Sequence, residues 1–304
     1  MTKNEWKTQL IHPNYKKGDR ILCENYRPVS HIIEISKLVE YTVLEQVLKH
    51  FDENDLFHAN HNGSLPNHST ATAIIQLYDI WIEAIENNMI TAALLLDLSA
   101  AFDLVGHRIL LKKMKLYNFS EGSLKFFREY FENRKIVVQI DSKRSTPKEG
   151  GEIGVPQGSV LGVLCFLINQ NDFPASEAEN DNSVLYMDDD TDNVIDSNPT
   201  NLMIKLQQQA NKSTEWISDN GMVCSGGKTK LIIMASRDIR LSKIDFNTNF
   251  QVNVCNKVVS ESADEKLLGV IISNDLTWRR HVNRYVDSRI SLPFVSISAK
   301  YFRR

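Results

Sequence analysis

The chain has 304 residues, of which 42% are hydrophobic and 24% charged, and its formal net charge is −3. This composition is that of a globular protein with one large or two modest domains, so a disordered or fibrous chain is excluded. The longest apolar runs fall short of the roughly 18 to 20 residues that span a bilayer, and the amino terminus lacks the apolar core of a secretion signal. We therefore expect an intracellular protein that is cytoplasmic, nuclear or both, is not secreted and has no membrane partner.

Hydrophobic periodicity and turn residues divide the chain into alternating helices and strands. In chain order the pattern predicts helices over 31–50 and 70–86, a strand over 90–96, helices over 105–117 and 123–132, a strand over 136–140, a helix over 159–168, a hairpin of 183–187 and 193–195 about an acidic turn, a helix over 201–220, and strands over 231–234, 252–259 and 267–272. This alternation predicts an α/β or α+β fold.

The charges are distributed unevenly along the chain. Residues 100–150 contain 11 Lys and Arg against 6 Asp and Glu, and residues 226–304 contain 14 against 7. Between them, residues 172–196 contain nine acids and no Lys or Arg. An acidic segment flanked by basic ones is typical of a metal centre inside a phosphate-binding surface, although chance clustering of surface charge remains the alternative.

Three of the acids follow apolar strands. Asp97 ends the run over 90–96, and Asp188 with Asp189 follows the strand over 183–187. Carboxylates that converge at strand ends repel one another unless a cation neutralises them, and Mg²⁺ takes oxygen ligands. The sequence is therefore compatible with a Mg²⁺ site, but for these acids taken alone the simpler interpretation, that Asp188 and Asp189 only terminate a hairpin turn, is the favoured one.

Two other ligand-binding motifs match the sequence only in part, and the mismatches weaken the first and exclude the second. Residues 226–229 (GGKT) are similar to the end of a phosphate-binding P-loop, but that motif requires glycine where this chain has Met222. The alternating acids that begin at Asp188 are similar to a calcium loop, but Asn193 and Pro199 stand where that loop needs Gly and Glu. A P-loop NTPase is therefore the weaker rival function.

Seven short motifs occur in one order along the chain. They are residues 25–30 (NYRPVS), Gly63 with 69–70 (ST), 96–103 (LDLSAAFD), 154–162 (GVPQGSVLG), 186–189 (YMDD), 228–230 (KTK) and 267–270 (LLGV). In these motifs and their spacing, the chain resembles the reverse transcriptases of non-LTR, LINE-type retrotransposons from about residue 16 to residue 278. The resemblance implies a right-hand polymerase fold with an antiparallel palm sheet.

The resemblance assigns a role to each matching residue of the reaction centre. Asp97, Asp188 and Asp189 match the catalytic triad, which implies two bound Mg²⁺ ions, with Mn²⁺ as the alternative. The backbone carbonyl of Leu98 matches an auxiliary metal ligand. Phe102 matches the steric gate that favours a deoxynucleotide over a ribonucleotide, whereas ordinary core packing is the alternative for this ring.

Four further residues match positions that surround the incoming nucleotide. Arg27 matches the arginine that contacts the triphosphate, and Gln157 with Gly158 matches the loop that supports nucleotide and template. Lys228 matches a lysine that gives a proton to the departing pyrophosphate. The implied partners are an RNA template, a DNA primer and deoxynucleoside triphosphates.

The resemblance divides the chain into interleaved parts. We expect fingers over 1–89, a first palm segment over 90–106, a fingers or palm insertion over 107–150, further palm over 151–275 and the start of a truncated thumb or connection over 276–304.

Some positions depart from the family pattern. Ser64 and Leu65 replace Phe and Arg, and Asp190 and Asp192 replace uncharged residues beside the triad. Buried carboxylates are costly, so these two acids are expected to disturb the metal geometry. Two hypotheses follow: an RNA-directed DNA polymerase, or a catalytically inactive nucleic-acid-binding remnant of one.

Overall fold

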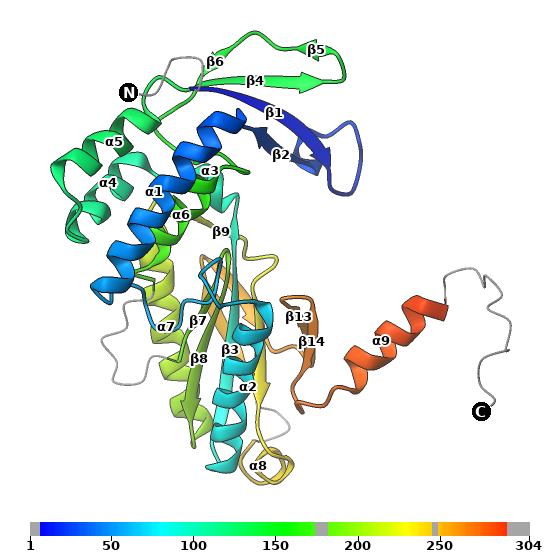
Figure 1. The fold of residues 1–304 in the computed structure, drawn as a ribbon. Helices are drawn as coiled ribbons and strands as arrows, with labels where there is room; N and C mark the ends of the chain where they lie inside the picture. Colours follow the sequence, from blue (N-terminus) through cyan, green and yellow to red (C-terminus); the bar gives the residue numbers. More distant parts are fainter. Residues whose placement is uncertain (1–6, 174–181, 245–248, 291–304) are drawn as a thin grey trace, which may run out of the picture.

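The computed structural model describes residues 7–173, 182–244 and 249–290, and in it two β-sheets are joined by helices (Figure 1). The upper sheet of Figure 1 contains β1 (Thr8–Tyr15), β2 (Tyr26–His31), β4 (Lys135–Ile140), β5 (Lys143–Arg144) and β6 (Lys148–Glu149). A short 3-10 helix, η2 (Cys23–Asn25), precedes β2. Because β1 pairs with β2 antiparallel and with β4 parallel, two segments distant in the sequence share this sheet.

The central sheet is antiparallel and is built around β3 (Ile90–Ser99). β3 lies between β8 (Asp189–Asp196) and β10 (Lys230–Met234), β7 (Val184–Tyr186) pairs with β8, and β9 (Val223–Cys224) pairs with the last residues of β3. From Ile90 to Leu96 every residue of β3 is buried, which confirms the predicted central strand.

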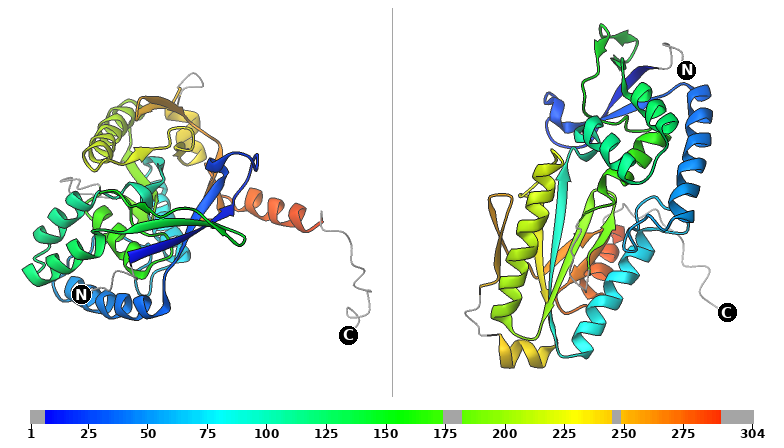
Figure 2. Two further views of the ribbon diagram at one scale, coloured as in Figure 1. Left: turned by 90° about the horizontal axis from the view of Figure 1, so that it is seen from above. Right: turned by 90° about the vertical axis from the view of Figure 1, so that its left-hand side faces the viewer.

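Two helices cover opposite faces of the central sheet, as the right-hand view of Figure 2 shows. α2 (Thr70–Glu86) packs on the face that carries Ala93 and Leu95, and α7 (Pro199–Asp219) packs on the face that carries Leu94 and Leu96. Successive side chains of a strand point to opposite faces, so burial on both faces explains why β3 is apolar throughout. α2 thus lies against the central sheet, although its residues fall in the range 1–89 that we expected to form fingers.

A group of helices lies between the two sheets on the left of Figure 1. They are α1 (Glu34–Glu53), α3 (Ala101–Leu104), α4 (His107–Leu116), α5 (Glu121–Phe131) and α6 (Val160–Gln170). Phe51 of α1 is fully buried, and its ring packs against the rings of Phe57, Tyr117 and Phe119. This aromatic cluster holds the end of α1 against the segment that joins α4 to α5.

The segment after β10 contains α8 (Arg237–Lys243), the hairpin of β11 (Gln251–Val254) and β12 (Lys257–Ser260), the hairpin of β13 (Asp264–Leu267) and β14 (Val270–Ser273), and α9 (Arg279–Ile290). The single strands expected over 252–259 and 267–272 are therefore wrong. Each is interrupted by a turn with left-handed backbone, at Cys255 and Asn256 (φ 49° and 61°) and at Leu268 and Gly269 (φ 47° and 90°). Turns of this hand match the twist of the flanking strands, and Cys-Asn is not one of the usual turn signals.

The hairpin around the acidic run also differs from the expectation. Its turn is formed by Met187 and Asp188, and β8 begins at Asp189, so Asp190 and Asp192 lie within the strand. Their side chains alternate with that of Asp189 and are buried on the opposite face.

Both carboxylates have local donors. Gln170 Nε2 donates to the two oxygens of Asp190 at 2.7 and 2.8 Å, and the hydroxyls of Ser183 and Ser213 donate to Asp192 at 2.9 and 2.7 Å. Burial, with the charge of Asp192, raises the pKa of Asp190 well above its usual value. The side chains of the two acids therefore point to the face opposite Asp97 and Asp189, but the charges of Asp189 and Asp188 still act on Asp190. The expected disturbance of the metal geometry stays a prediction.

None of the described helices combines the length and the apolar character that crossing a bilayer requires. The part of the range 276–304 that lies beyond Ile290 is outside the described residues.

Replacing Trp81 with Phe tests the polar contact under α2. The indole Nε1 donates to Asn193 Oδ1 at 2.7 Å in a buried position, so Trp81→Phe leaves a buried amide oxygen unpaired. We expect the free energy of unfolding, measured by urea titration, to fall by about 1–3 kcal/mol. The matched control is Trp278→Phe, because Trp278 is 45% exposed and stacks on Tyr78. This variant should change the free energy of unfolding by no more than about 0.5 kcal/mol. Equal losses in both variants would contradict the assigned bond.

Candidate active site

Asp97 and Asp189 face each other across neighbouring strands at one end of the central sheet. The register of β3 and β8 pairs the two residues directly. Directly opposed residues of an antiparallel pair have Cβ atoms about 4.5–5.5 Å apart. Asp188 occupies the turn before β8, and its carbonyl oxygen lies 3.5 Å from the amide nitrogen of Leu98. The structure thus places three acids from two distant segments at one strand end.

The acids perturb one another electrostatically. Burial, then the charges of Asp188 and Asp97, raise the pKa of Asp189 from 3.8 to about 6, while the ammonium of Lys228 acts in the opposite direction. Like charges this close disfavour full ionisation unless a cation is present. The arrangement therefore favours binding of a cation.

Lys228 supplies the counter-charge to Asp97. Its Nζ lies 2.7 Å from Asp97 Oδ1, and its side chain is 56% exposed. Among the described residues, no group of three or more His, Cys, Asp and Glu side chains is already arranged to hold a metal ion. An ion that binds Asp97 must therefore share this carboxylate with the ammonium or replace it.

Backbone bonds hold the segment of Lys228 against β3. Cys224 of β9 pairs with Leu98, and the amide of Ser225 donates to the carbonyl of Asp97 at 2.8 Å. The amides of Lys228 and Thr229 both donate to the carbonyl of Ser225, at 2.8 and 3.0 Å, which closes a tight turn. This turn brings the lysine to Asp97 from 131 residues further along the chain.

Phe102 lies just past the carboxylates, on the single-turn helix α3. Ala100, with left-handed backbone at φ 49°, turns the chain from β3 into this helix. The Phe102 ring is partly buried and stacks on Phe166 of α6, with ring centroids 4.7 Å apart and planes 20° apart. The carbonyl of Phe102 accepts from the amide of Val155 at 2.8 Å. One face of the ring therefore packs in the core, as expected if Phe102 is an ordinary core residue.

The loop of Gln157 and Gly158 packs against the upper sheet. The carbonyl of Gln157 accepts from the amide of Ser30 in β2 at 2.8 Å. Gly158 has φ 101°, and a Cβ there would lie 2.9 Å from the carbonyl oxygen of Ser30, so glycine is required. Arg27 lies exposed on the same strand as Ser30. The structure thus joins the strand of Arg27 to the loop of Gln157, which places two predicted nucleotide contacts on adjoining elements.

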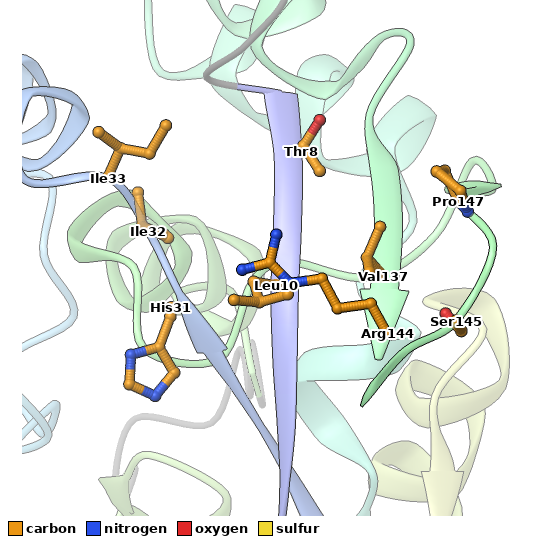
Figure 3. A pocket seen from close by; sticks show the side chains of 9 residues that line it. All are labelled: Thr8, Leu10, His31, Ile32, Ile33, Val137, Arg144, Ser145 and Pro147. Atoms are coloured by element: carbon orange, nitrogen blue, oxygen red, sulfur yellow. The ribbon is translucent and has the colours of Figure 1, made fainter. Parts of the chain in front are cut away.

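A hollow of about 510 Å³ lies on the outer face of the upper sheet (Figure 3). Leu10 and Val137 contribute to its lining, with Arg144 and His31 beside them. None of the site residues predicted from sequence lines it. Its position therefore separates it from the carboxylates of the central sheet.

Glu40 is a buried residue that the sequence analysis missed. It lies on α1 with 2% exposure, and its Oε2 accepts from the amides of Val160 and Leu161 at 2.9 and 3.3 Å, at the beginning of α6. Tyr130 donates its hydroxyl to Oε1 at 3.1 Å. A carboxylate is favourable at a helix N-terminus, so Glu40 fixes α6 directly after the Gln157 loop. A charged residue on the buried face of α1, shared with Ser36 and Val47, was the available signal.

The geometry corresponds to the palm and fingers of a right-hand polymerase, with carboxylates at the end of an antiparallel sheet below a second sheet. The chain belongs to the reverse transcriptase (RNA-dependent DNA polymerase) family, whose sequence pattern matches residues 15–272. Its relatives place it with the reverse transcriptase domains of non-LTR, LINE-type elements. The family resemblance and the fold class predicted from sequence are thereby confirmed.

The relatives include proteins of Drosophila. The chain is 28% identical over 267 residues to the RNA-directed DNA polymerase from mobile element jockey of Drosophila funebris. The matched region covers 85% of this chain and 28% of that protein. It is 29% identical over 175 residues to the probable RNA-directed DNA polymerase from transposon BS of Drosophila melanogaster. Here the matched region covers 57% of this chain and 19% of that protein. The chain thus spans less than a third of the length of these relatives.

The fold is also similar to that of solved polymerases. An apo telomerase from Candida tropicalis, truncated from its C-terminal domain, superposes with a TM-score of 0.60 at 14% identity. The superposition covers 91% of this chain and 55% of that one. At this identity the likeness supports the right-hand fold alone.

The burial of His61 should make the stability of the protein depend on pH. It is 1% exposed, and within the described part of the chain neither ring nitrogen has a hydrogen-bond partner. Burial, with the nearby His58 and His68, lowers its pKa from 6.5 to about 4. The unfolded state therefore binds more protons between these values, and the stability present above pH 6.5 is lost as the pH falls toward 4.

We expect wild-type protein to lose about 2 kcal/mol more unfolding free energy than His61→Phe between pH 7.5 and pH 5. Urea titrations of both proteins at each pH measure the difference. The same pH dependence in the two proteins would show that His61 does not titrate in this way.

Proposed function

We propose that this domain is an RNA-directed DNA polymerase that adds deoxynucleotides to the 3′-hydroxyl of a DNA primer paired with an RNA template. The observation that carries the proposal is the register of Asp97 against Asp189, with Asp188 in the adjoining turn. In the reaction the primer oxygen forms a bond to the α-phosphorus of the nucleotide, and the bond to the leaving pyrophosphate breaks. Chemistry of this type needs acids that gather hard cations beside the primer end.

The residues at this site fit Mg²⁺. The donors are carboxylate oxygens, and the crowding that raises the pKa of Asp189 is relieved by a divalent ion. We assign Asp97, Asp188 and Asp189 as the residues that hold two Mg²⁺ ions, or Mn²⁺, with the carbonyl of Leu98 as a further ligand. When bound, such a pair supplies activation of the attacking hydroxyl and stabilisation of the leaving oxygen.

The remaining residues bind and orient the nucleotide in this proposal. Arg27 presents a fork of donors suited to a triphosphate, and Gln157 with Gly158 supports the nucleotide and the template. Phe102 lies under the sugar with the ring face that does not stack on Phe166. Lys228 neutralises part of the charge of Asp97 and, in this proposal, gives a proton to the pyrophosphate as it leaves.

The second candidate function is that of an inactive nucleic-acid-binding remnant. The observation that favours it is Leu65, which replaces an arginine of the family pattern and is buried at 9% exposure. A basic contact to nucleic acid is therefore absent at this described position. Primer extension on an RNA template with Mg²⁺ separates the two candidates, since a remnant binds primer and template without extending the primer.

Replacing Asp97 with Asn tests the central assignment. Asp97→Asn should lower the rate of primer extension by at least about 100-fold, because it removes one charge from the cation site. Affinity for primer and template, measured by fluorescence anisotropy, should stay within about three-fold, because phosphate contacts supply most of it. Asp219→Asn, at an exposed residue on α7, is the matched control. A parallel loss of binding and activity would show that Asp97 is structural.

Replacing Phe102 with Ala tests nucleotide discrimination. Phe102→Ala frees the space where a 2′-hydroxyl would lie, so incorporation of ribonucleotides relative to deoxynucleotides should rise about ten-fold or more. Losing the stack on Phe166 should also lower the unfolding free energy by about 1–3 kcal/mol. Phe126→Ala on α5 removes a partly buried ring from another cluster and should leave discrimination unchanged. If an active Phe102→Ala protein discriminated between ribonucleotides and deoxynucleotides as the wild type does, Phe102 would have a role in core packing only.

A further inference from the structure

A loop before α2 lies beside the hairpin that carries Asp188. This loop, residues 58–68, pairs with β7 through backbone bonds on both sides of Leu185. The amide of Asn62 donates to the Leu185 carbonyl at 2.7 Å, and the amide of Leu185 donates to the Asn60 carbonyl at 3.0 Å. The loop thus covers the edge of β7 that β8 leaves open.

The other side of the loop is fixed to α2. Asn62 Nδ2 donates to Gln76 Oε1 at 2.6 Å, and Gln76 Nε2 donates to Asn60 Oδ1 at 2.8 Å. The hydroxyl of Thr72 donates to Asn62 Oδ1 at 3.3 Å. Because α2 packs on the central sheet, these bonds connect the loop to a helix that contacts β3 directly.

The loop approaches the turn before β8 most closely at Gly63. A Cβ at this glycine would lie 2.5 Å from the backbone nitrogen of Met187 and 3.0 Å from its Cγ. Met187 has left-handed backbone at φ 59°, and the Ser64 hydroxyl contacts its sulfur at 3.1 Å. No side chain fits between the loop and the turn, so the backbone of one fixes the position of the other.

We propose that loop 58–68 positions the Met187–Asp188 turn, and with it the Asp188 carboxylate, and that Gly63 and Gln76 are positioning residues for nucleotide addition. This inference rests on the proposed function. A methyl group at Gly63 must push the turn away by about 1 Å to reach ordinary contact distance. A displacement of this size at a reacting centre costs about 100-fold in rate.

The first experiment separates positioning from nucleotide binding. We expect Gly63→Ala to lower kcat for single-nucleotide addition about 100-fold, with KM for the deoxynucleotide within about three-fold, because Arg27 and Gln157 lie on other elements. Gly122→Ala, in α5, adds the same methyl group where the nearest atom is 3.8 Å away, and it should leave both constants unchanged. A fall confined to KM, or full kcat in Gly63→Ala, would overturn the inference.

The second experiment does not depend on activity. The chain has seven methionines, so the ¹³C-methyl signal of Met187 can be assigned by its disappearance in Met187→Leu. This signal should shift in Gly63→Ala and in Gln76→Leu. It should not shift in the two controls, Gly122→Ala and Gln208→Leu, the second of which replaces an exposed glutamine of α7. Gln76→Leu leaves the loop sequence intact and carries the test if Gly63→Ala does not fold.

The outcomes distinguish the two proposals. If wild-type protein extends no primer, the proposed function fails, whereas the Met187 signal still reports on the contact between loop and turn. If wild-type protein is active and the Met187 signal is unchanged in both loop variants, the positioning role is refuted and the proposed function stands.

Discussion

The pairing of β3 with β8 is the interaction on which the site depends. It runs from Ile90 opposite Asp196 to Asp97 opposite Asp189, so a slip of one residue would turn Asp189 to the other face of the sheet. Packing on both faces prevents such a slip, because α2 takes one set of alternating side chains and α7 takes the other. The buried acids Asp190 and Asp192 also favour this register, because the side chains that donate hydrogen bonds to them lie on the α7 face of the sheet.

Much of the fold followed from hydrophobic patterning. The helices over 70–86 and 201–220 and the central strand were predicted to within a few residues, because their apolar positions have clear periods. β1 and β2 were not predicted, because their burial is only partial and a parallel partner, β4, lies far along the chain. The hairpins around Cys255 and Leu268 were read as single strands, because neither turn begins with Gly, Pro or Asp.

The site was predicted less evenly. Asp97, Asp188, Asp189 and Lys228 were found from motifs, and the structure brings the segments that carry them together through the β3–β8 register and the Ser225 turn. The roles given to Arg27, Gln157 and Phe102 stay predictions. Glu40 and the contact at Gly63 were beyond sequence reasoning, because each depends on a neighbour more than 100 residues away that no local pattern announces.

The order of strands in the central sheet has a consequence for synthesis. β3 is among the most apolar segments of the chain, yet its partners β8 and β10 begin at Asp189 and Lys230, long after β3 has left the ribosome. During that interval both of its edges are unpaired, and an unpaired apolar strand is a template for association with other chains. Non-local pairing of this kind also slows folding after release. α2 precedes β3 in the chain and packs on one of its faces, so it can cover that face, although not the two open edges, before either neighbouring strand is made.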